Sequence, residues 1–269
     1  MLPRMSYEPP PIYPRHVMCF VGTGLDLERC RKIATEVGGP EFTLDDDNSE
    51  AAPNPNMPQA FQASLTMASF TDDDWDAVER HDSVAYILSP PMRPSTEVDN
   101  SRRMLAVTDA LLRDGAGAAK NESSGLAHGR DKWLGLAELA ATADDEAELL
   151  EALYYAFVKR PIFDGEVLYS CGMQLFGEAD IELSDTDIAD QERLRERVDV
   201  MDAFGLYLLT EERARELTDG AGFREEPEAR RWLLHRRADT RTDFDDIAFN
   251  LTGLWRLSPA DAAGDAPGQ

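Results

Sequence analysis

The stretch Ser83-Val84-Ala85-Tyr86-Ile87-Leu88 is the clearest strand in the sequence, and Pro90-Pro91 ends it because proline cannot donate to a strand ladder. A second apolar, β-rich run lies at His16–Val21, and a third candidate strand lies at Ala116–Lys120. We expect these three strands to share one sheet, since sequential strand–helix–strand units bury their apolar faces most simply in that way.

Helical spacing of apolar residues predicts helices that pack against this sheet. The first is Leu27–Val37, with Asp26 as its N-cap and Gly38 as its stop, and the second is Met104–Arg113. The sequence Thr71-Asp72-Asp73-Asp74 has the form of a capping box and opens a third, shorter helix.

Weaker patterns predict the remaining elements. Apolar residues alternate along Phe61–Met67, which is typical of a half-buried strand, and the proline-rich Asp45–Pro58 before it favours a long loop. Gly172 and Gly177 predict a tight turn with Met173 and Phe176 facing inward. Further helices are expected at Lys132–Ala141, Glu146–Val158 and Asp187–Leu208, and further strands at Ile162–Tyr169, Ile181–Leu183, Arg231–Arg237 and Phe249–Leu257.

Helices and strands are short and interspersed, which favours an α+β fold made of two associated α/β halves. We expect mixed or antiparallel sheets with helices packed on them. The proline-rich start predicts a flexible arm, and the Ala/Gly/Pro/Asp-rich end predicts a disordered tail. The divisions are an arm at 1–15, an N-terminal half at 16–143, a C-terminal half at 144–258 and a tail at 259–269.

The chain of 269 residues is strongly acidic, with 52 acidic and 27 basic residues and a net charge of −25. This balance argues against binding to nucleic acid, which depends on Lys and Arg at the phosphates, and against binding to anionic membranes. Only four of the basic residues are lysine, so a GC-rich genome or a saline cytoplasm explains the acidity equally well. The charge therefore bears on solubility and partner choice and not on the fold.

Known site patterns are missing from the sequence. The three cysteines cannot all pair and have no C-x-x-C spacing, and the four histidines lie far apart. Gly22-Thr23-Gly24 follows a strand, but Leu27 stands where a dinucleotide-binding loop has its third glycine, and Asp26 and Glu28 would repel a phosphate. We therefore assign no catalytic residue, no cofactor and no metal, and the absence of a signal peptide favours a cytoplasmic protein.

The densest polar cluster is Lys120-Asn121-Glu122-Ser123-Ser124-Gly125 with His128 after it. A base, a nucleophile and a cation at the end of a strand could form a polar site of Lys120, Glu122, Ser123 and His128. However, Ser123 lacks the G-x-S-x-G elbow that activates a serine hydroxyl. A solvated or ion-paired loop is the simpler interpretation, and we expect Glu122, Ser123 and His128 not to form a catalytic centre.

Two segments carry a resemblance. They are His81-Asp82-Ser83-Val84-Ala85-Tyr86-Ile87-Leu88-Ser89, followed by the polar cluster and Trp133, and Tyr169-Ser170-Cys171-Gly172-Met173-Gln174-Leu175-Phe176-Gly177-Glu178-Ala179-Asp180-Ile181-Glu182. Together they resemble bacterial proteins of the domain-of-unknown-function family 4261, over about half of the chain. The resemblance implies a bacterial cytosolic protein, and some such small acidic proteins are encoded beside secreted toxins. It implies no catalytic residue.

Three functions remain open. The first is a non-enzymatic acidic protein that binds a protein partner, such as an immunity protein that neutralises a basic toxin. The second is a hydrolase or transferase that uses the polar cluster, and the third is an acidic nucleic-acid mimic. No oligomeric state is predicted. For partner binding, the candidate residues are Asp45, Asp46, Asp47, Asp72, Asp73, Asp74, Asp243, Asp245 and Asp246.

Overall fold

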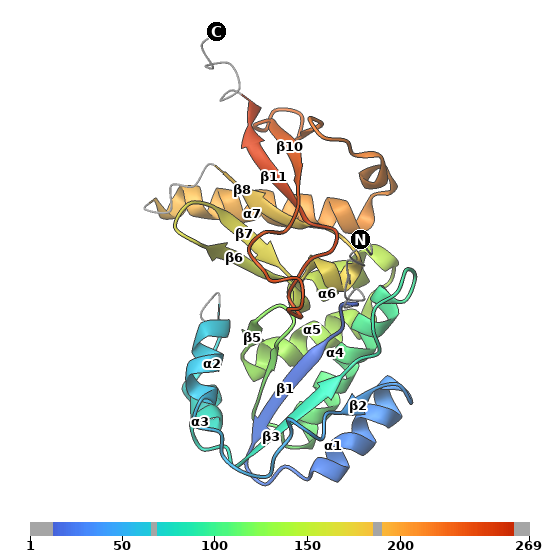
Figure 1. Cartoon of the computed structure of the whole chain (residues 1–269), viewed down its shortest axis with the longest axis vertical. Coiled ribbons are helices and arrows are strands. Elements are labelled where there is room, and N and C mark those ends of the chain that lie inside the picture. Colours follow the sequence, from blue (N-terminus) through green and yellow to red (C-terminus); the bar gives the residue numbers. More distant parts are fainter. Residues whose placement is uncertain (1–12, 66–68, 185–189, 261–269) are drawn as a thin grey trace, which may run out of the picture.

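The computed structural model describes residues 13–65, 69–184 and 190–260, and it has an α+β fold with two sheets (Figure 1). The first sheet has the strand order β2-β3-β1-β4-β5, and all neighbouring strands are antiparallel. The three strands predicted to share a sheet do so, side by side as β3, β1 and β4. The strands of this sheet are β1 (Val17–Gly22), β2 (Thr43–Leu44), β3 (Ser83–Leu88), β4 (Ala118–Asn121) and β5 (Leu126–His128).

Both faces of the first sheet are covered by helices. Along β1, Met18 and Phe20 face one hydrophobic cluster, whereas Cys19 and Val21 face another. The strand is apolar throughout because side chains alternate between two buried faces. The helices α1 (Leu27–Ile33), α4 (Glu97–Asp114) and α5 (Arg130–Thr142) cover one face, and α2 (Met57–Ser64) and α3 (Asp72–Glu79) cover the other.

The local signals for the first helices are confirmed. The side chain of Asp26 accepts hydrogen bonds from the amides of Glu28 and Arg29 at the start of α1. This helix continues as a short π-helical turn, η1 (Ala34–Gly38). Thr71 and Asp74 form the capping box of α3.

The strand predicted at Phe61–Met67 is wrong. Residues 61–64 lie in α2, Leu65 follows it, and residues 66–67 lie outside the described residues. Met57 and Phe61 are spaced one helical turn apart, and both are buried against the first sheet. The apolar residues 57, 61 and 65 have helical spacing, whereas the alternation along Phe61–Met67 has strand spacing, so the sequence is compatible with both. Packing against the sheet favours the helix.

The second sheet has the strand order β6-β7-β8-β11-β10-β9. The β8–β11 pair is parallel, and the other neighbouring strands are antiparallel. The strand predicted at Phe249–Leu257 begins only at Leu254, because residues 250–253 form a turn. Helix α7 packs on one face of this sheet through Val200, Met201 and Phe204. The elements of this half are α6 (Glu146–Phe157), β6 (Lys159–Phe163), β7 (Leu168–Cys171), β8 (Asp180–Leu183), α7 (Gln191–Thr210), η3 (Glu212–Glu216), β9 (Gly222–Phe223), β10 (Trp232–Arg237) and β11 (Leu254–Pro259).

The single strand predicted at Ile162–Tyr169 is also wrong, because the chain turns back within it to form the β6–β7 hairpin. The Asp164 carboxylate accepts hydrogen bonds from the amides of Glu166 and Val167 and so closes the turn. Gly165 provides the positive φ of 105° that the turn requires.

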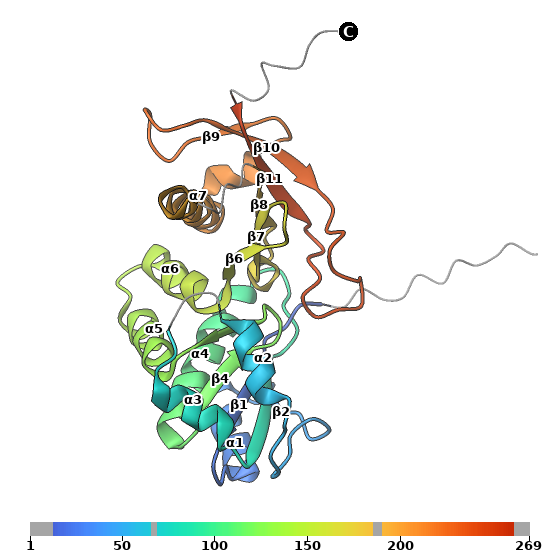
Figure 2. The same cartoon turned by 90° about the vertical axis from the view of Figure 1, so that its left-hand side faces the viewer.

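One hydrophobic core joins the two halves. It runs from α1 and α4 through α5 and α6 to α7, and it includes buried side chains of both sheets. Figure 2 shows α5, α6 and α7 in succession along one side of the molecule, with β6, β7, β8, β10 and β11 to the right of α6 and α7. The boundary drawn between residues 143 and 144 falls in the short connection between α5 and α6.

The predicted Gly172–Gly177 turn is confirmed as a buried 3-10 turn, η2 (Met173–Phe176). Gly172 has φ 130°, and a Cβ atom added there would lie 2.5 Å from the carbonyl oxygen of Phe157. The turn therefore lies directly against the end of α6, where only glycine fits.

We expect Gly172→Ala to lower the free energy of unfolding by roughly 1–3 kcal/mol more than Gly165→Ala does. Both glycines have positive φ, but a Cβ at Gly165 would meet nothing within 4 Å. Urea unfolding of both variants measures the difference. Equal destabilisation would show that the contact with α6 does not constrain the turn.

Candidate functional site

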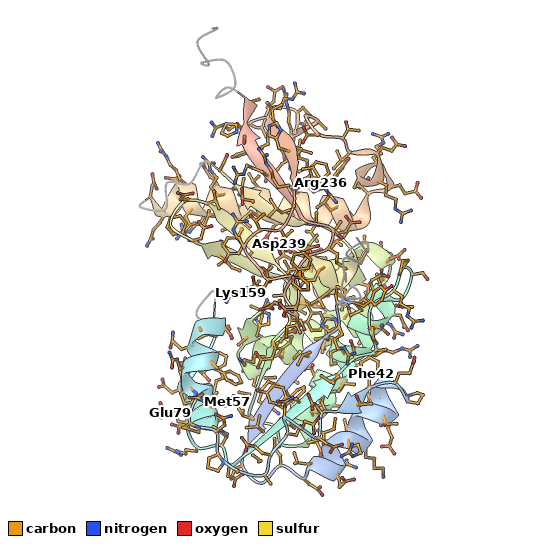
Figure 3. All side chains as sticks on the ribbon, in the orientation of Figure 1. Phe42, Met57, Glu79, Lys159, Arg236 and Asp239 are labelled. Carbon is orange, nitrogen blue, oxygen red and sulfur yellow. The ribbon has the colours of Figure 1, made fainter. Side chains whose placement is uncertain are left out.

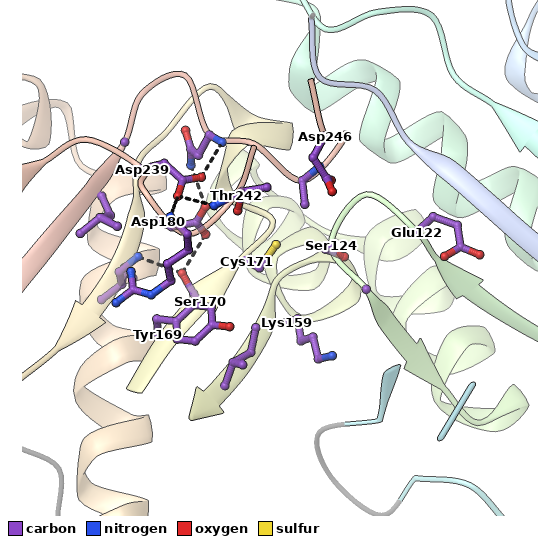
Figure 4. Close-up of a pocket in the computed structure, with 18 residues that line it drawn as sticks. Glu122, Ser124, Lys159, Tyr169, Ser170, Cys171, Asp180, Asp239, Thr242 and Asp246 are labelled. Carbon is purple, nitrogen blue, oxygen red and sulfur yellow. Dashed lines mark hydrogen bonds between the residues drawn. The ribbon is translucent and has the colours of Figure 1, made fainter. Parts of the chain in front are cut away.

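A pocket of about 400 Å³ lies where the two sheets meet (Figure 4). The β4–β5 turn contributes Glu122, Ser124 and Gly125 from the first sheet, and the ends of β6, β7 and β8 form the opposite wall. The β10–β11 connection, residues 238–253, extends from the ends of β10 and β11 that face the first half, and it lines one side of the pocket (Figure 1). Lys159 and Asp239 both lie near this middle region of the molecule (Figure 3).

One end of the pocket is a fully hydrogen-bonded acidic cluster around Asp180. Its carboxylate accepts hydrogen bonds from Ser170 Oγ, the Met173 amide and Asn250 Nδ2, at 2.9, 3.3 and 2.7 Å. Burial raises the pKa of Asp180 to about 6, although these hydrogen bonds favour the charged form. The nearby Asp239 carboxylate acts in the same direction as burial.

Asp239 fixes the β10–β11 connection to this end of the pocket. Its carboxylate accepts hydrogen bonds from the amides of Arg241, Thr242 and Asn250, at 3.0, 3.3 and 3.1 Å. The connection is therefore held at both of its ends, and its middle residues, 243–249, lie between two fixed points.

Beside the pocket, Glu182 forms a buried ion-pair cluster on the face of β8 that is turned away from α7. Its carboxylate contacts the guanidinium groups of both Arg241 and Arg256. Arg241 also contacts Asp164 at 3.2 Å and lies 4.7 Å from the ring centre of Tyr169. A buried carboxylate requires such partners, since an unpaired charge in the interior is costly.

At the other end of the pocket stands Lys159, directly opposite Cys171 in the β6–β7 register. Its amino group donates a hydrogen bond to the carbonyl oxygen of Ala63 at 2.9 Å. Burial lowers the pKa of Lys159, and burial also raises the pKa of Cys171. The thiol is therefore protonated at neutral pH and is not an activated nucleophile.

The structure separates the residues of the predicted polar site. Lys120 and Glu122 form an ion pair at 2.9 Å, but His128 Nε2 lies 3.1 Å from the carbonyl oxygen of Tyr155. The Ser123 hydroxyl donates to the carbonyl oxygen of Arg15 at 2.6 Å. No serine–histidine contact is therefore present between these two residues.

Ser123 belongs instead to a buried network around His16. Asn121 Oδ1 accepts a hydrogen bond from the Ser123 amide, so Asn121 Nδ2 faces His16 Nδ1, 3.0 Å away. Nδ1 is then the acceptor, and the proton of the neutral ring is on Nε2, which lies 2.9 Å from Ser101 Oγ. Gln174 Nε2 adds a hydrogen bond to the Ser123 carbonyl oxygen.

The aspartates proposed for partner binding fall into three environments. Asp74 is buried and accepts from the amides of Thr71 and Arg130, so it has a structural role at the start of α3. Asp46 contacts Arg31, and Asp45 caps the turn that contains Asp47. The remaining members, Asp72, Asp73, Asp243, Asp245 and Asp246, are exposed.

Acidic residues are distributed over both halves of the chain. Residues 16–143 contain 21 acidic and 11 basic residues, and residues 144–258 contain 28 acidic and 14 basic residues. The excess of negative charge therefore does not distinguish one half from the other. A site has to be identified from features other than charge.

The Gly22-Thr23-Gly24 turn has its own acidic partner. The Gly24 amide donates to the Asp82 carboxylate at 2.6 Å, and the Leu25 amide donates to Ser83 Oγ. Hydrogen bonds from the Gly24 amide and from the Ser83 hydroxyl lower the pKa of Asp82. A carboxylate and a hydroxyl group of the chain thus occupy the two amides that a phosphate would need.

Comparison of the chain with protein-family models, with curated proteins and with solved structures finds no match. The resemblance to the domain-of-unknown-function family 4261 therefore stays a prediction. The segment Tyr169–Glu182, which carries part of it, supplies one wall of the pocket.

Within the described part of the chain, no helix has the length and apolar character needed to cross a membrane. The same residues contain no group of three or more His, Cys, Asp or Glu side chains arranged to hold a metal ion.

The His16 network predicts a loss of stability in mild acid. Burial lowers the pKa of His16 to about 3, whereas the unfolded chain protonates near 6.5. Between these values the unfolded state binds the additional proton, so stability falls as the pH falls, by up to about 1.4 kcal/mol per pH unit. Urea unfolding of wild type and His16→Gln between pH 7.5 and 5 measures this contribution.

Other groups also titrate in mild acid, among them Glu178 and Glu225, whose pKa values burial raises, so the difference between the two proteins is the informative quantity. His128, whose pKa is lowered by burial to about 4, acts in the same direction as His16. Asp180, with its raised pKa, acts in the opposite direction below about pH 6. All of these groups remain in His16→Gln. Parallel pH dependences in the two proteins would contradict a neutral, buried His16.

Proposed function

We propose that this protein is a non-enzymatic binding protein that takes a basic protein partner, as an immunity protein takes a toxin. Its contact surface is the segment Asp243–Leu251 of the β10–β11 connection, here named the acidic loop. The observation that carries the proposal is the exposure of large apolar side chains in this loop: Phe244 is 59% exposed, Ile247 38% and Leu251 54%.

These apolar side chains alternate with Asp243, Asp245 and Asp246. Exposed aromatic and aliphatic side chains supply most of the binding energy when a partner desolvates them, and surrounding charges select the partner. The loop presents both kinds of group together. A partner with an apolar depression surrounded by Lys and Arg fits this combination.

The exposed apolar surface extends beyond the loop. Ile247 lines a pocket of about 260 Å³ together with Tyr13, Pro14, Arg15 and Pro91, and Tyr13 is itself exposed. The patch thus combines segments that are far apart in the sequence. An apolar patch of this kind, built from several segments, is typical of an interaction surface.

The loop is held in place before any partner arrives. Asp239 binds the amides at its beginning, and Asn250 near its end donates to Asp180 and to the carbonyl oxygen of Glu178. A contact surface that is already ordered loses less conformational entropy on binding. The charge of −25 also accelerates the encounter with a cationic partner at low salt.

The two alternatives draw less support from the geometry. A hydrolase or transferase at the polar cluster would need Ser123 and His128 in contact, but their side chains bind the carbonyl oxygens of Arg15 and Tyr155. A nucleic-acid mimic would need regularly placed exposed charges and would gain nothing from exposed Phe244 and Ile247. The apolar component of the acidic loop is what favours a protein partner.

The first test removes the apolar contacts. The triple variant Phe244→Ala, Ile247→Ala and Leu251→Ala should weaken binding to the partner by at least about 100-fold, since truncation of each anchor residue costs on the order of 1–2 kcal/mol. The partner is first captured from the native host with tagged wild-type protein and identified by mass spectrometry. Affinity is then measured with the purified pair.

Leu139→Ala is the matched control, because Leu139 on α5 is equally exposed but lies outside the acidic loop. It should bind like wild type. Equal affinities of the triple variant and wild type would overturn the proposal. So would a captured partner that DNA displaces from both proteins equally, which would favour the nucleic-acid mimic.

The second test concerns charge. Reversal of Asp243 and Asp245 to Lys should slow association several-fold at low salt and change dissociation less, because peripheral charges act mainly by steering. The matched control reverses Glu41 and Asp47, two exposed acids beside β2 and in the turn after it. Equal slowing by both pairs in stopped-flow measurements would assign the effect to overall charge.

A further inference from the structure

We propose that the pocket between the two sheets binds a small molecule that carries an oxyanion group, either a carboxylate or a phosphate. Lys159 and Ser124 bind this oxyanion group. The proposal does not depend on a partner protein, although Asp246, Ala248 and Asn250 of the acidic loop line one side of the pocket. The proposal rests on two polar groups in the pocket wall whose bonding requirements the described residues do not meet.

The first group is the amine of Lys159. Its one hydrogen bond within the described residues goes to the carbonyl oxygen of Ala63, and no carboxylate of those residues lies within 4.0 Å of it. Such isolation is unexpected in a chain with almost two acids for every base. Cationic groups that are partly buried normally have an anionic partner, and a bound anion would supply it.

The second group is the hydroxyl of Ser124. It is buried in the wall of the same pocket, and it has no hydrogen-bond partner among the described residues. A buried hydroxyl without a partner is uncommon in a folded protein. Lys159 Nζ lies close to Gly125, the residue after Ser124, because a Cβ atom built on this glycine would be 3.7 Å from it, an ordinary contact distance.

The surroundings define the rest of the ligand. A second lysine, Lys120, lies near this end of the pocket. Its positive charge contributes to the lowered pKa of Lys159, but Lys120 is itself paired with Glu122. Across the pocket, Thr242, which precedes the acidic loop, presents a hydroxyl group, and Asp246 of the loop presents a carboxylate. These groups fit hydroxyl or amino substituents on a small polar molecule, and the volume of about 400 Å³ suits a ligand of metabolite size.

The test measures the binding of citrate, as the carboxylate probe, and inorganic phosphate to the full chain. Each is titrated by isothermal calorimetry at constant ionic strength, balanced with sodium chloride, because salt alone stabilises a protein of this charge by screening. Wild type should bind at least one probe saturably, and the other probe identifies which oxyanion the site prefers. At tenfold excess over Kd the thermal midpoint should rise by about 3 °C or more.

Lys159→Met should raise the Kd of that probe at least tenfold, and Ser124→Ala several-fold. Lys132→Met removes the same charge from an exposed lysine on α5 and should leave the Kd unchanged. Near-ultraviolet circular dichroism establishes that each variant is folded. The proposal is overturned if wild type binds neither probe saturably, or if Lys159→Met binds as wild type does.

A labelling experiment on the unaltered chain guards against a misfolded variant. Lys159 should be reductively methylated more slowly when the bound probe is present, and Lys132 should react at the same rate with and without it. Mass spectrometry of the digested protein measures both rates. Equal rates at Lys159 in the two conditions would place the anion elsewhere and contradict the proposal.

Discussion

The hydrogen bond between Asn121 and His16 lies at the centre of the buried polar network at the junction of the two halves. This network joins the start of β1, the end of β4 and helix α4 through Ser101, and it reaches the second half through Gln174 of the turn η2, whose Nε2 donates to the Ser123 carbonyl oxygen. Because the whole network is removed from water, each donor needs its acceptor, and the elements can dock in only one arrangement. The turn η2 is thereby held against the β4–β5 turn, and the pocket forms beside that contact.

The second sheet is stabilised in a different way from the first, because its two faces differ in polarity. Ile181 and Leu183 of β8 pack towards α7, whereas Asp180 and Glu182 face the other side, which the β10–β11 connection covers. These carboxylates are almost completely buried, so they require partners: Asn250 of the connection donates to Asp180, and Arg241 of the connection and Arg256 of β11 contact Glu182. The connection therefore serves two purposes: it completes the polar face of the sheet, and it presents its own apolar side chains outward.

The sequence predicted well those elements whose local signals agree with their packing. The strands β1 and β3, the capping box of Thr71 and the Gly172–Gly177 turn each have signals that neighbouring structure reinforces. Prediction was wrong for α2, where helical and strand spacing coincide, and for the β6–β7 hairpin, whose Asp164-Gly165 turn interrupts a continuous apolar run. The short strand β5 was missed because three residues are too few to show an alternation of apolar and polar side chains.

The pocket could not be found from the sequence, because its walls come from five segments between residues 122 and 254 that only the fold brings together.

One signal of the pocket was nevertheless present in the sequence. In Ala179-Asp180-Ile181-Glu182-Leu183 the acids alternate with apolar residues, which normally marks a strand with one face in water. Here the acidic face is buried, so the alternation identified a polar interior and not a surface. In a chain this acidic, an aspartate points to a site where it is buried with hydrogen-bond partners, as Asp180 is. A lysine points to a site where it has no carboxylate partner among the described residues, as is true of Lys159. The net charge alone identifies neither residue.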